Sequence, residues 1–458
     1  MTECIQQTLA FQAVGSRRVE MDFEGGEVTS DAGALLLGEA DSARRIVGRF
    51  AGRCFTDSRN QNLVTHSLES LLRQRVFGLA LGYEDVNDHE TLRDDAALRT
   101  LCGAEDSEER LAGKSTLNRV EVSAGAERRD ERYHKIAFDP SKFHGLLRDL
   151  FFEAHAAEPA EIVLDLDATD FVLHGGQEGR FYQGYYRDYC YLPLYIFCGG
   201  HLLHAELRPS NIDAALGSVE AIAPIVSAIK KRWSACRIIV RGDSGFCRDD
   251  LMDWCETRGV SYILGLAQNS RLRERCSHQR EKARRRFLRT GEAVRYYTSF
   301  GYRTKKSWSA KRRVVAKCEH LSKGANPRFV VTNLLASEIN NRDLYENGYC
   351  RRGDMENRIM EQLELFADRT SCSGFAANQL RMALSSMAYV LMNTLRGALA
   401  GTEIENAHPN TIRLRLLKIG ARVRTSVRRI LFSCASGYPW RDLFLSCYSN
   451  LQALGTSP

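Results

Sequence analysis

Two apolar segments that both end in aspartate constrain the fold of this chain more than any other feature of its sequence. EIVLDLDATD spans residues 161–170, and RIIVRGDSGF spans residues 237–246. Runs of β-branched and apolar residues that end at Gly, Asp and Ser are typical of buried strands that end in turns. Because open α/β sheets bind ligands at the carboxyl ends of their strands, we expect Asp167 and Asp243 to lie together at one edge of a sheet.

The segments around these strands predict a sheet with the strand order of ribonuclease H. After the first strand the patterns indicate a strand pair, a helix, a strand, a helix and a strand, over 192–209, 214–233, 237–243, 248–259 and 260–266. The next element of that fold is a helix that carries an acid, and here it begins only near residue 349. The basic segment in between is rich in residues that favour strands, so we interpret it as an inserted small β domain.

The predicted organisation has four regions. Residues 1–155 form a mainly helical N-terminal region, as the helical spacing of the apolar residues in LVTHSLESLLRQRVFGLAL indicates. The residues leave open whether this region binds a ligand or only packs. The α/β, ribonuclease H-like (retroviral integrase-like) core is expected at 156–268 and 336–400, the basic β-rich insertion at 269–335, and a basic helical C-terminal region at 401–458.

The first strand carries two candidate acids. Asp165 and Asp167 point to the same side of it, because residues two apart in a strand share a face, and Leu164 and Leu166 then point into the core. We favour Asp167, which lies nearer the open end of the strand. Asp165 remains a candidate for shared metal binding.

A third acid, Glu356, lies on a helix predicted near YCRRGDMENRIMEQ, residues 349–362. At about 100° per residue, Tyr349, Arg352 and Glu356 fall on one narrow stripe of that helix. Arg352 and Glu356 are four residues apart, so the guanidinium is positioned to orient or partly neutralise the carboxylate. Two strand-end aspartates and a helix glutamate are hard oxygen ligands, which favours divalent cations and phosphoryl transfer on nucleic acid.

Each acid also has an ordinary structural interpretation. Asp167 suits a strand-end turn, Asp243 an Asx-turn, and Glu356 a surface ion pair with Arg352. Taken together, two apolar strands that both end in acid favour a shared site over three unrelated structural roles.

The distribution of positive charge points to the same class of partner. The formal net charge is +7, and basic clusters lie at 271–289, 301–317 and 413–429. One such cluster is most often a solvated face. Three clusters in a chain with a predicted carboxylate site favour contacts with the phosphates of a polynucleotide.

Cysteine usage and hydropathy narrow the class of protein further. The 14 cysteines are spread singly along the chain without a CxxC pair, so we expect apolar core residues in a reducing compartment rather than zinc ligands or disulfides. No uninterrupted apolar run approaches about 18 residues, and the N-terminus lacks the apolar region of a signal peptide. We therefore expect a cytoplasmic protein that does not contact the membrane.

The motifs DATD, VRGDSGF and YCRRGDMENRI resemble the three catalytic blocks of DDE-type transposases of bacterial insertion sequences. The resemblance is to the cut-and-paste group with a β-strand insertion, whose tyrosine–arginine–glutamate–lysine signature matches Tyr349, Arg352 and Glu356. The signature's lysine falls on Leu363, so the phosphate contact of that lysine is either absent here or made by a neighbour such as Arg358 or Arg369. Further similar stretches cover nearly the whole chain, at 62–95, 189–197, 307–319, 366–382 and 416–430.

This resemblance implies a function and a set of site residues. Asp167, Asp243 and Glu356 would hold two Mg²⁺ ions, with Mn²⁺ able to substitute, and catalyse cleavage and strand transfer of DNA. The partners implied are terminal inverted repeats and target DNA, with N-terminal residues in end binding and a homodimer in the DNA complex. The expected DNA contacts are Tyr349, Arg352, Lys305, Lys306, Trp308, Arg312, Arg313, Arg422 and Arg424.

Three questions stay open at the level of the sequence. Trp308 suits stacking on an unpaired base and suits an ordinary core position equally well. The same carboxylates would serve a metal-dependent nuclease without strand transfer. A transposase-derived DNA-binding protein that has lost catalysis would keep the basic clusters, although the presence of all three acids disfavours it.

Overall fold

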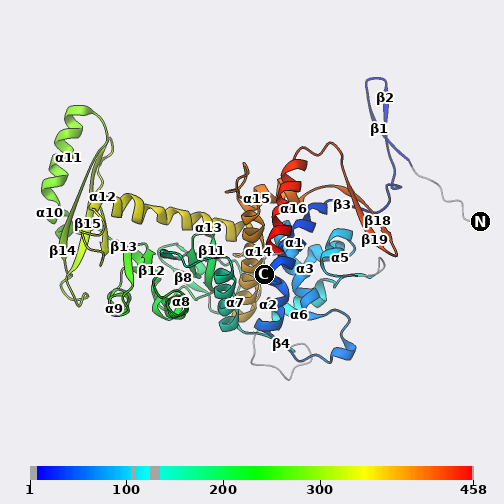
Figure 1. Cartoon of the computed structure of the whole chain (residues 1–458), viewed down its shortest axis with the longest axis horizontal. Helices are drawn as coiled ribbons and strands as arrows, with labels where there is room; N and C mark the ends of the chain where they lie inside the picture. The colour runs from blue at the N-terminus through cyan, green and yellow to red at the C-terminus, as the bar shows by residue number, and fades with distance from the viewer. Residues whose placement is uncertain (1–7, 105–108, 124–134, 456–458) are drawn as a thin grey trace, which may run out of the picture. The chain divides into compact units, whose positions relative to one another are not determined.

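The structure is a computed structural model that describes residues 8–104, 109–123 and 135–455 (Figure 1). Contacts divide the chain into two units. The first comprises Met1–Ala51, Asp57–Val120 and Met387–Pro458, and the second comprises Gly52–Thr56 and Glu121–Ser386. This division differs from the predicted boundary at residue 155: the N-terminal and C-terminal residues share one unit, and the described residues 121–123 and 135–155 belong to the unit that contains the central sheet.

A large mixed sheet forms the centre of the second unit. Its strands lie in the order β11 (His201–Glu206), β10 (Leu194–Cys198), β6 (Glu161–Ala168), β12 (Arg237–Gly242), β13 (Ser261–Leu266), β17 (Arg328–Thr332), β15 (Arg312–Leu321) and β14 (Val294–Tyr302), with β16 (Gly324–Ala325) beside β15. β12 is parallel to β6 and β13, and the other pairings are antiparallel. The order of the first five strands is consistent with the predicted ribonuclease H-like arrangement.

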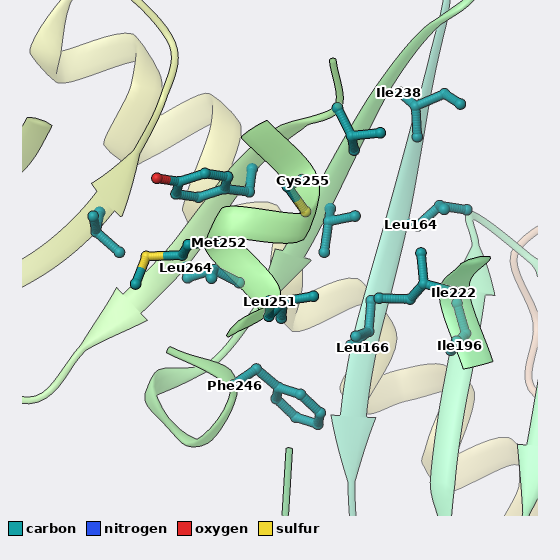
Figure 2. Close-up of a cluster of buried hydrophobic side chains, with 14 of the residues drawn as sticks. Leu164, Leu166, Ile196, Ile222, Ile238, Phe246, Leu251, Met252, Cys255 and Leu264 are labelled. Carbon is teal, nitrogen blue, oxygen red and sulfur yellow. The ribbon is translucent and has the colours of Figure 1, made fainter. Parts of the chain in front are cut away.

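One face of this sheet packs against α8 (Ser218–Arg232) and α9 (Asp249–Thr257), as Figure 2 shows. Leu164 and Leu166 are fully buried in that cluster, as the alternation along β6 predicts. Ile222 enters the cluster from α8 and Leu251 from α9. Burying each such side chain contributes about 1.5–3 kcal/mol, so these contacts fix the register of β6 and therefore the position of its carboxyl end.

The opposite face of the sheet is covered by a helical segment. It comprises α12 (Asn341–Asp343), the π-helical η6 (Leu344–Tyr349), η7 (Cys350–Arg352) and α13 (Gly353–Glu364). Leu344 and Tyr345 pack in one cluster with Ile239 of β12 and Ile263 of β13. Ile238 and Val240 lie in the other cluster. β12 is therefore buried on both faces, which explains its continuous apolar sequence.

The predicted small β domain at 269–335 is instead an extension of the central sheet. β17 pairs with β13, and β15 and β14 follow it in the same sheet. The basic stretch at 271–289 is helical, as α10 (Ser270–Arg275) and α11 (Ser277–Thr290). Pairing with β17 satisfies the backbone groups that would otherwise leave β13 as an open sheet edge.

Two residues predicted to contact DNA are buried in this extension. Trp308 is 4% exposed and packs edge-on against Tyr302, with ring centroids 5.6 Å apart. Arg312 is 5% exposed and is held by carboxylates of α9, at 2.6 Å from Asp249 and 2.8 Å from Glu256. In this structure both side chains are therefore held by protein partners and are not exposed for contact with DNA.

Arg313 also differs from its prediction. Its guanidinium donates to the backbone carbonyl oxygens of Leu334 and Ile339, at 2.8 and 3.1 Å, and to the side chain of Asn341 at 2.8 Å. These bonds tie β15 to the loop after β17 and direct the side chain into the protein. Lys305 and Lys306, in the same basic cluster, are exposed.

Further elements complete the second unit. α7 (Pro140–Glu153) lies against β11, where His144 Nε2 is 3.1 Å from the carbonyl oxygen of Ala205. β4 (Phe55–Asp57) pairs with β5 (Ile136–Phe138). The last residue of β4, Asp57, already belongs to the first unit. A three-stranded sheet has the order β7 (Phe171–Val172), β9 (Asp188–Tyr191) and β8 (Phe181–Gln183). α14 (Phe375–Gly397) begins in this unit and ends in the first.

The first unit is mainly helical. Its main helices are α1 (Leu35–Arg44), α2 (Ile46–Cys54), α3 (Leu68–Leu81), α5 (Ala96–Leu101), α6 (Lys114–Val122) and α16 (Arg441–Gly455), with short η8 (Arg413–Leu417), and α2 and α6 end beyond the unit boundary. Asp31 accepts a hydrogen bond from Tyr83 at 2.6 Å and pairs with Lys418 at 2.7 Å. These bonds join three distant parts of the chain. None of the helices in the described ranges is long and apolar enough to cross a membrane.

Part of the C-terminal region predicted as helical forms a β hairpin instead. β18 (Ala421–Ser426) pairs with β19 (Arg429–Cys434) and with β3 (Val28–Thr29). Ala421 and Val423 are buried, whereas Arg422 and Arg424 are exposed. This alternation with a period of two fits a half-buried strand. A separate hairpin of β1 (Leu9–Val14) and β2 (Arg17–Met21) is exposed along its length.

The burial of Trp308 leads to a first prediction. Trp308→Ala should lower the free energy of unfolding by about 3–5 kcal/mol, because it leaves a large cavity in a packed core. Lys306→Ala in the same loop is the matched control and should leave stability unchanged, since its side chain is exposed. Chemical denaturation measures both variants. A Trp308→Ala variant with wild-type stability and weakened DNA binding would restore the role in DNA contact.

Candidate active site

Asp167 lies at the carboxyl end of β6, where the central sheet opens. Its Oδ1 accepts the backbone N–H of Ala168 at 2.9 Å, and its Oδ2 accepts a hydrogen bond from Arg352 at 2.9 Å. The side chain is 15% exposed. The pKa of Asp167 is raised to about 6: burial is the main cause and the charges of Asp243 and Glu356 add to it, whereas Arg352 and the backbone N–H of Ala168 oppose the shift.

Asp243 leaves the sheet beside Asp167. Gly242 pairs with Leu166 in the parallel ladder of β12 and β6, so the residues that follow, Asp243 and Asp167, emerge at the same edge. The carboxylate of Asp243 accepts the backbone N–H of Gly245 at 2.8 Å and caps the short helix η5 (Ser244–Phe246). The structure therefore brings together the two strand-end aspartates, as the sequence predicts.

Arg352 joins the third acid to the first. It lies at the end of η7, and its guanidinium bonds Glu356 at 2.6 Å as well as Asp167 at 2.9 Å. The side chain of Arg352 is 19% exposed and that of Glu356 is 60% exposed. The predicted stripe therefore faces the edge of the sheet, and Arg352 contacts both acids rather than Glu356 alone.

Asp165 has a different role from Asp167. Its two carboxylate oxygens accept hydrogen bonds from Arg241 of the neighbouring strand, at 2.5 and 2.7 Å. Both side chains are buried, at 6% and 8% exposure. Arg241 also donates to the carbonyl oxygen of Gly348 at 2.6 Å. The prediction that Asp165 shares a metal is not supported, since both of its oxygens are held in a buried ion pair.

The Tyr349 hydroxyl and the backbone of Asp243 both lie close to Gly265. A Cβ atom on Gly265 of β13 would lie 2.6 Å from the Tyr349 hydroxyl, 2.9 Å from the Ser244 nitrogen and 3.1 Å from the Asp243 carbonyl carbon. Only glycine fits at this position. A cavity of about 110 Å³ borders these groups and is lined by Ser244, Gly265, Gln268, Arg328 and Tyr349 among others.

The donor chemistry of the three acids fits a hard divalent cation. A positive group, the Arg352 guanidinium, already bridges Asp167 and Glu356 and shows that the edge of the sheet accommodates a cation between carboxylates. Within residues 8–104, 109–123 and 135–455, no group of three or more His, Cys, Asp and Glu side chains is arranged to hold a metal ion.

The remaining predicted DNA contacts are carried by other elements. Lys305 and Lys306 are exposed in the loop between β14 and β15, and Arg422 and Arg424 are exposed on β18. Leu363, which replaces the signature's lysine, is half-buried in the last turn of α13.

Sequence reasoning missed a group of aromatic residues beside this site. The hairpin of β8 and β9 carries four exposed aromatic side chains, at positions 181, 182, 185 and 189. The sequence FYQGYYRDYCY at 181–191 contains the signal, as a density of tyrosine unusual for a surface turn.

Comparisons with known proteins give one family. The family model described as "Transposase DDE domain group 1" matches residues 11–456. Among solved structures, the chain is similar to the piggyBac transposase in a cryo-EM structure of its synaptic complex with hairpin DNA. That similarity has 14% sequence identity and a TM-score of 0.37, and covers 94% of this chain and 83% of that chain. A comparison with curated proteins finds no match.

The ion pair of Asp165 leads to a second prediction. Asp165→Asn should lower the free energy of unfolding by about 3–5 kcal/mol, because it leaves the buried guanidinium of Arg241 without a counter-charge. Thermal and chemical denaturation measure the loss. Asp170→Asn, at a half-buried acid five residues further along the chain, is the matched control. Wild-type stability in Asp165→Asn would contradict a structural role for this acid.

The raised pKa of Asp167 leads to a third prediction with the opposite sign. An acid whose pKa is higher in the folded state opposes folding once it ionises, so its penalty grows as pH rises from about 4 to about 6 and is complete above that. Asp167→Asn removes the penalty and should increase the free energy of unfolding by up to about 3 kcal/mol at pH 7.5. The gain should vanish below about pH 4. Denaturation in metal-free buffer across this range is the test, and a gain that does not depend on pH would contradict it.

Proposed function

Because the chain belongs to the family described as transposase DDE domain group 1, we propose that it binds the terminal inverted repeats of an insertion sequence and catalyses cleavage and strand transfer of DNA. The observation that carries the proposal is the arrangement at the carboxyl ends of β6 and β12. There Arg352 links Asp167 to Glu356, and Asp243 emerges beside them. The proposal includes a homodimer in the DNA complex.

The three acids Asp167, Asp243 and Glu356 would hold two Mg²⁺ ions, with Mn²⁺ able to substitute. When bound, these ions activate the attacking oxygen and stabilise charge on the leaving oxygen of a phosphodiester. The protein supplies the fixed positions of the acids: two lie at the carboxyl ends of adjacent parallel strands, and the third lies on the helix packed over the same sheet. Such positioning on rigid elements keeps the ligands in place through the reaction.

Arg352 has two roles in this proposal. In the structure described here its positive charge offsets the repulsion among the carboxylates, which stabilises the ionised form of Asp167. In the DNA complex the same guanidinium would turn to a phosphate, for which its planar donors are well suited. Tyr349, whose hydroxyl borders Gly265 as the backbone of Asp243 does, would contact DNA on the same side.

Exposed basic residues would supply most of the affinity for DNA. Lys305 and Lys306 lie in one exposed loop, and Arg422 and Arg424 both lie on the exposed face of β18. The outward face of α11 adds further arginines, whereas Ala283 faces the sheet. Phosphate contacts of this kind depend little on sequence and weaken as salt increases. Recognition of the terminal repeats therefore needs contacts to base edges as well.

A fourth prediction tests the assignment of the acids. Asp243→Asn and Glu356→Gln should each abolish divalent-metal-dependent cleavage of a terminal-repeat duplex while binding stays within about twofold, because phosphate contacts dominate affinity. Gel assays of cleavage and of joining to a target duplex measure the reaction, and a strand-joining product separates a transposase from a nuclease.

The matched control for this test is Asp354→Asn. Asp354 is an exposed acid on the first turn of the same helix, and Arg352 bonds Glu356 rather than Asp354. It should keep both cleavage and joining. Cleavage near the wild-type rate in Glu356→Gln would reject the site, and loss of DNA binding in that variant would assign it a role other than the one proposed.

A further inference from the structure

A hairpin beside the acids exposes an unusual number of aromatic rings. It is formed by β8 and β9, and its exposed side chains are Phe181 at 41%, Tyr182 at 58%, Tyr185 at 84% and Tyr189 at 44%. Exposed aromatic side chains gathered on one element indicate an interaction surface, because their hydration is unfavourable.

The rings form an ordered surface. Tyr182 lies directly opposite Tyr189 in the β8–β9 ladder, and their ring centroids are 5.6 Å apart. The guanidinium carbon of Arg180 lies 4.5 Å from the centroid of the Tyr189 ring. At the turn, the centroids of Tyr185 and Tyr186 are 4.9 Å apart. Planar groups therefore lie both along the ladder and at the tip.

The hairpin is anchored along β8 by hydrogen bonds to Ser210. Gln183 donates to the carbonyl oxygen of Ser210 at 2.7 Å, and the Ser210 hydroxyl donates to the carbonyl oxygen of Phe181 at 2.9 Å. The turn is closed by the backbone N–H of Arg187, which donates to the carbonyl oxygen of Gln183 at 2.8 Å. The backbone of Arg187 is left-handed there, with a φ of 62°. A surface held in this way loses little conformational entropy when it binds a ligand.

The chain path places this surface next to the acids. β7 begins three residues after the end of β6 and pairs with β9, and β9 leads into β10, whose Leu194 and Tyr195 pair with Ala168 and Asp167. The hairpin therefore extends from the same edge of the sheet that carries Asp167. Burial, together with the nearby carboxylates of Asp170 and Asp167, raises the pKa of the Tyr186 hydroxyl, so Tyr186 is also close to Asp167.

We propose that this tyrosine hairpin is a stacking platform for unpaired DNA bases next to the acids. The inference rests on the proposed function, since it takes a DNA phosphodiester at Asp167 as given. Flat aromatic faces with an adjoining guanidinium suit the faces of nucleobases without regard to sequence. Arg187, exposed at the turn, would contact the phosphate of a stacked nucleotide. Buried Trp308 cannot serve in this way, whereas the hairpin rings are open to solvent.

The test compares two DNAs that differ only in unpaired bases. One is a blunt terminal-repeat duplex, and the other is the same duplex extended by a short single strand that contains 2-aminopurine. Binding is measured by anisotropy in buffer without divalent metal, so that no cleavage occurs. The wild type should bind the extended DNA more tightly and quench the 2-aminopurine fluorescence, because stacking on an aromatic ring quenches the base.

The variants separate ring stacking from general DNA contact. Tyr182→Ala with Tyr185→Ala should weaken binding of the extended DNA by at least about fivefold and abolish quenching, with less than about twofold effect on the blunt duplex. Tyr182→Phe with Tyr185→Phe keeps the rings and should behave as wild type. Phe23→Ala, at an exposed aromatic residue of the first unit, is the matched control. Tyr185→Ala alone, at the most exposed ring, gives the same readout if the double variant folds poorly.

Three outcomes would overturn the inference. Unchanged binding and quenching in the alanine variants would assign the rings no role in DNA binding. Equal weakening on both DNAs would assign them to duplex contact rather than to base stacking. A wild type that binds both DNAs equally, and that cleaves DNA in the separate metal-dependent assay, would reject the platform alone. A wild type that binds neither DNA would reject the proposed function itself.

Discussion

One buried guanidinium fixes the helix of the third acid to the sheet of the other two. Arg241 of β12 pairs with Asp165 of β6 and donates to the carbonyl oxygen of Gly348 in η6, so three elements meet at one side chain. A buried ion pair adds little net stability over apolar packing, but loss of one partner is costly. Its value here is geometric, because Gly348 precedes the turn that carries Tyr349 and Arg352. The spacing between strand-end acids and helix acid therefore depends on it.

The acids at the open edge of the sheet lie in an environment that disfavours their ionised form. Burial and two neighbouring carboxylates oppose ionisation of Asp167, and Arg352 and the backbone N–H of Ala168 partly offset them. Functional sites commonly retain such unfavourable electrostatics, because the same concentration of charge attracts the cations that the chemistry needs. The two ion pairs therefore have different roles. The buried pair of Arg241 and Asp165 holds the strands and the helical segment together. The partly exposed guanidinium of Arg352 can exchange its carboxylate partners for another ligand.

The sequence predicts the parts of the fold that depend on local periodicity. The strands that end at Asp167 and Asp243 and the stripe of Tyr349, Arg352 and Glu356 follow from periods of two and 3.6 residues. It does not predict long-range pairing. β17 joins the edge of β13, so the region expected as a separate domain continues the sheet, and Trp308 becomes core. Asp165 shows the same limit, because its position on the same face as Asp167 gives no sign of its partner Arg241.

The basic residues also fall into two groups that composition cannot separate. Arg241, Arg312 and Arg313 are directed into the protein, where they bind carboxylates or backbone carbonyl oxygens. Lys305 and Lys306 are exposed, as are the arginines on the outer face of β18. Only groups of the second kind contribute to an external field. A basic cluster in a sequence is therefore weak evidence for a DNA-binding surface until the acids that face it are known. The three carboxylates of α9 around Arg312 lie about sixty residues away along the chain, so the local pattern of charge does not show them.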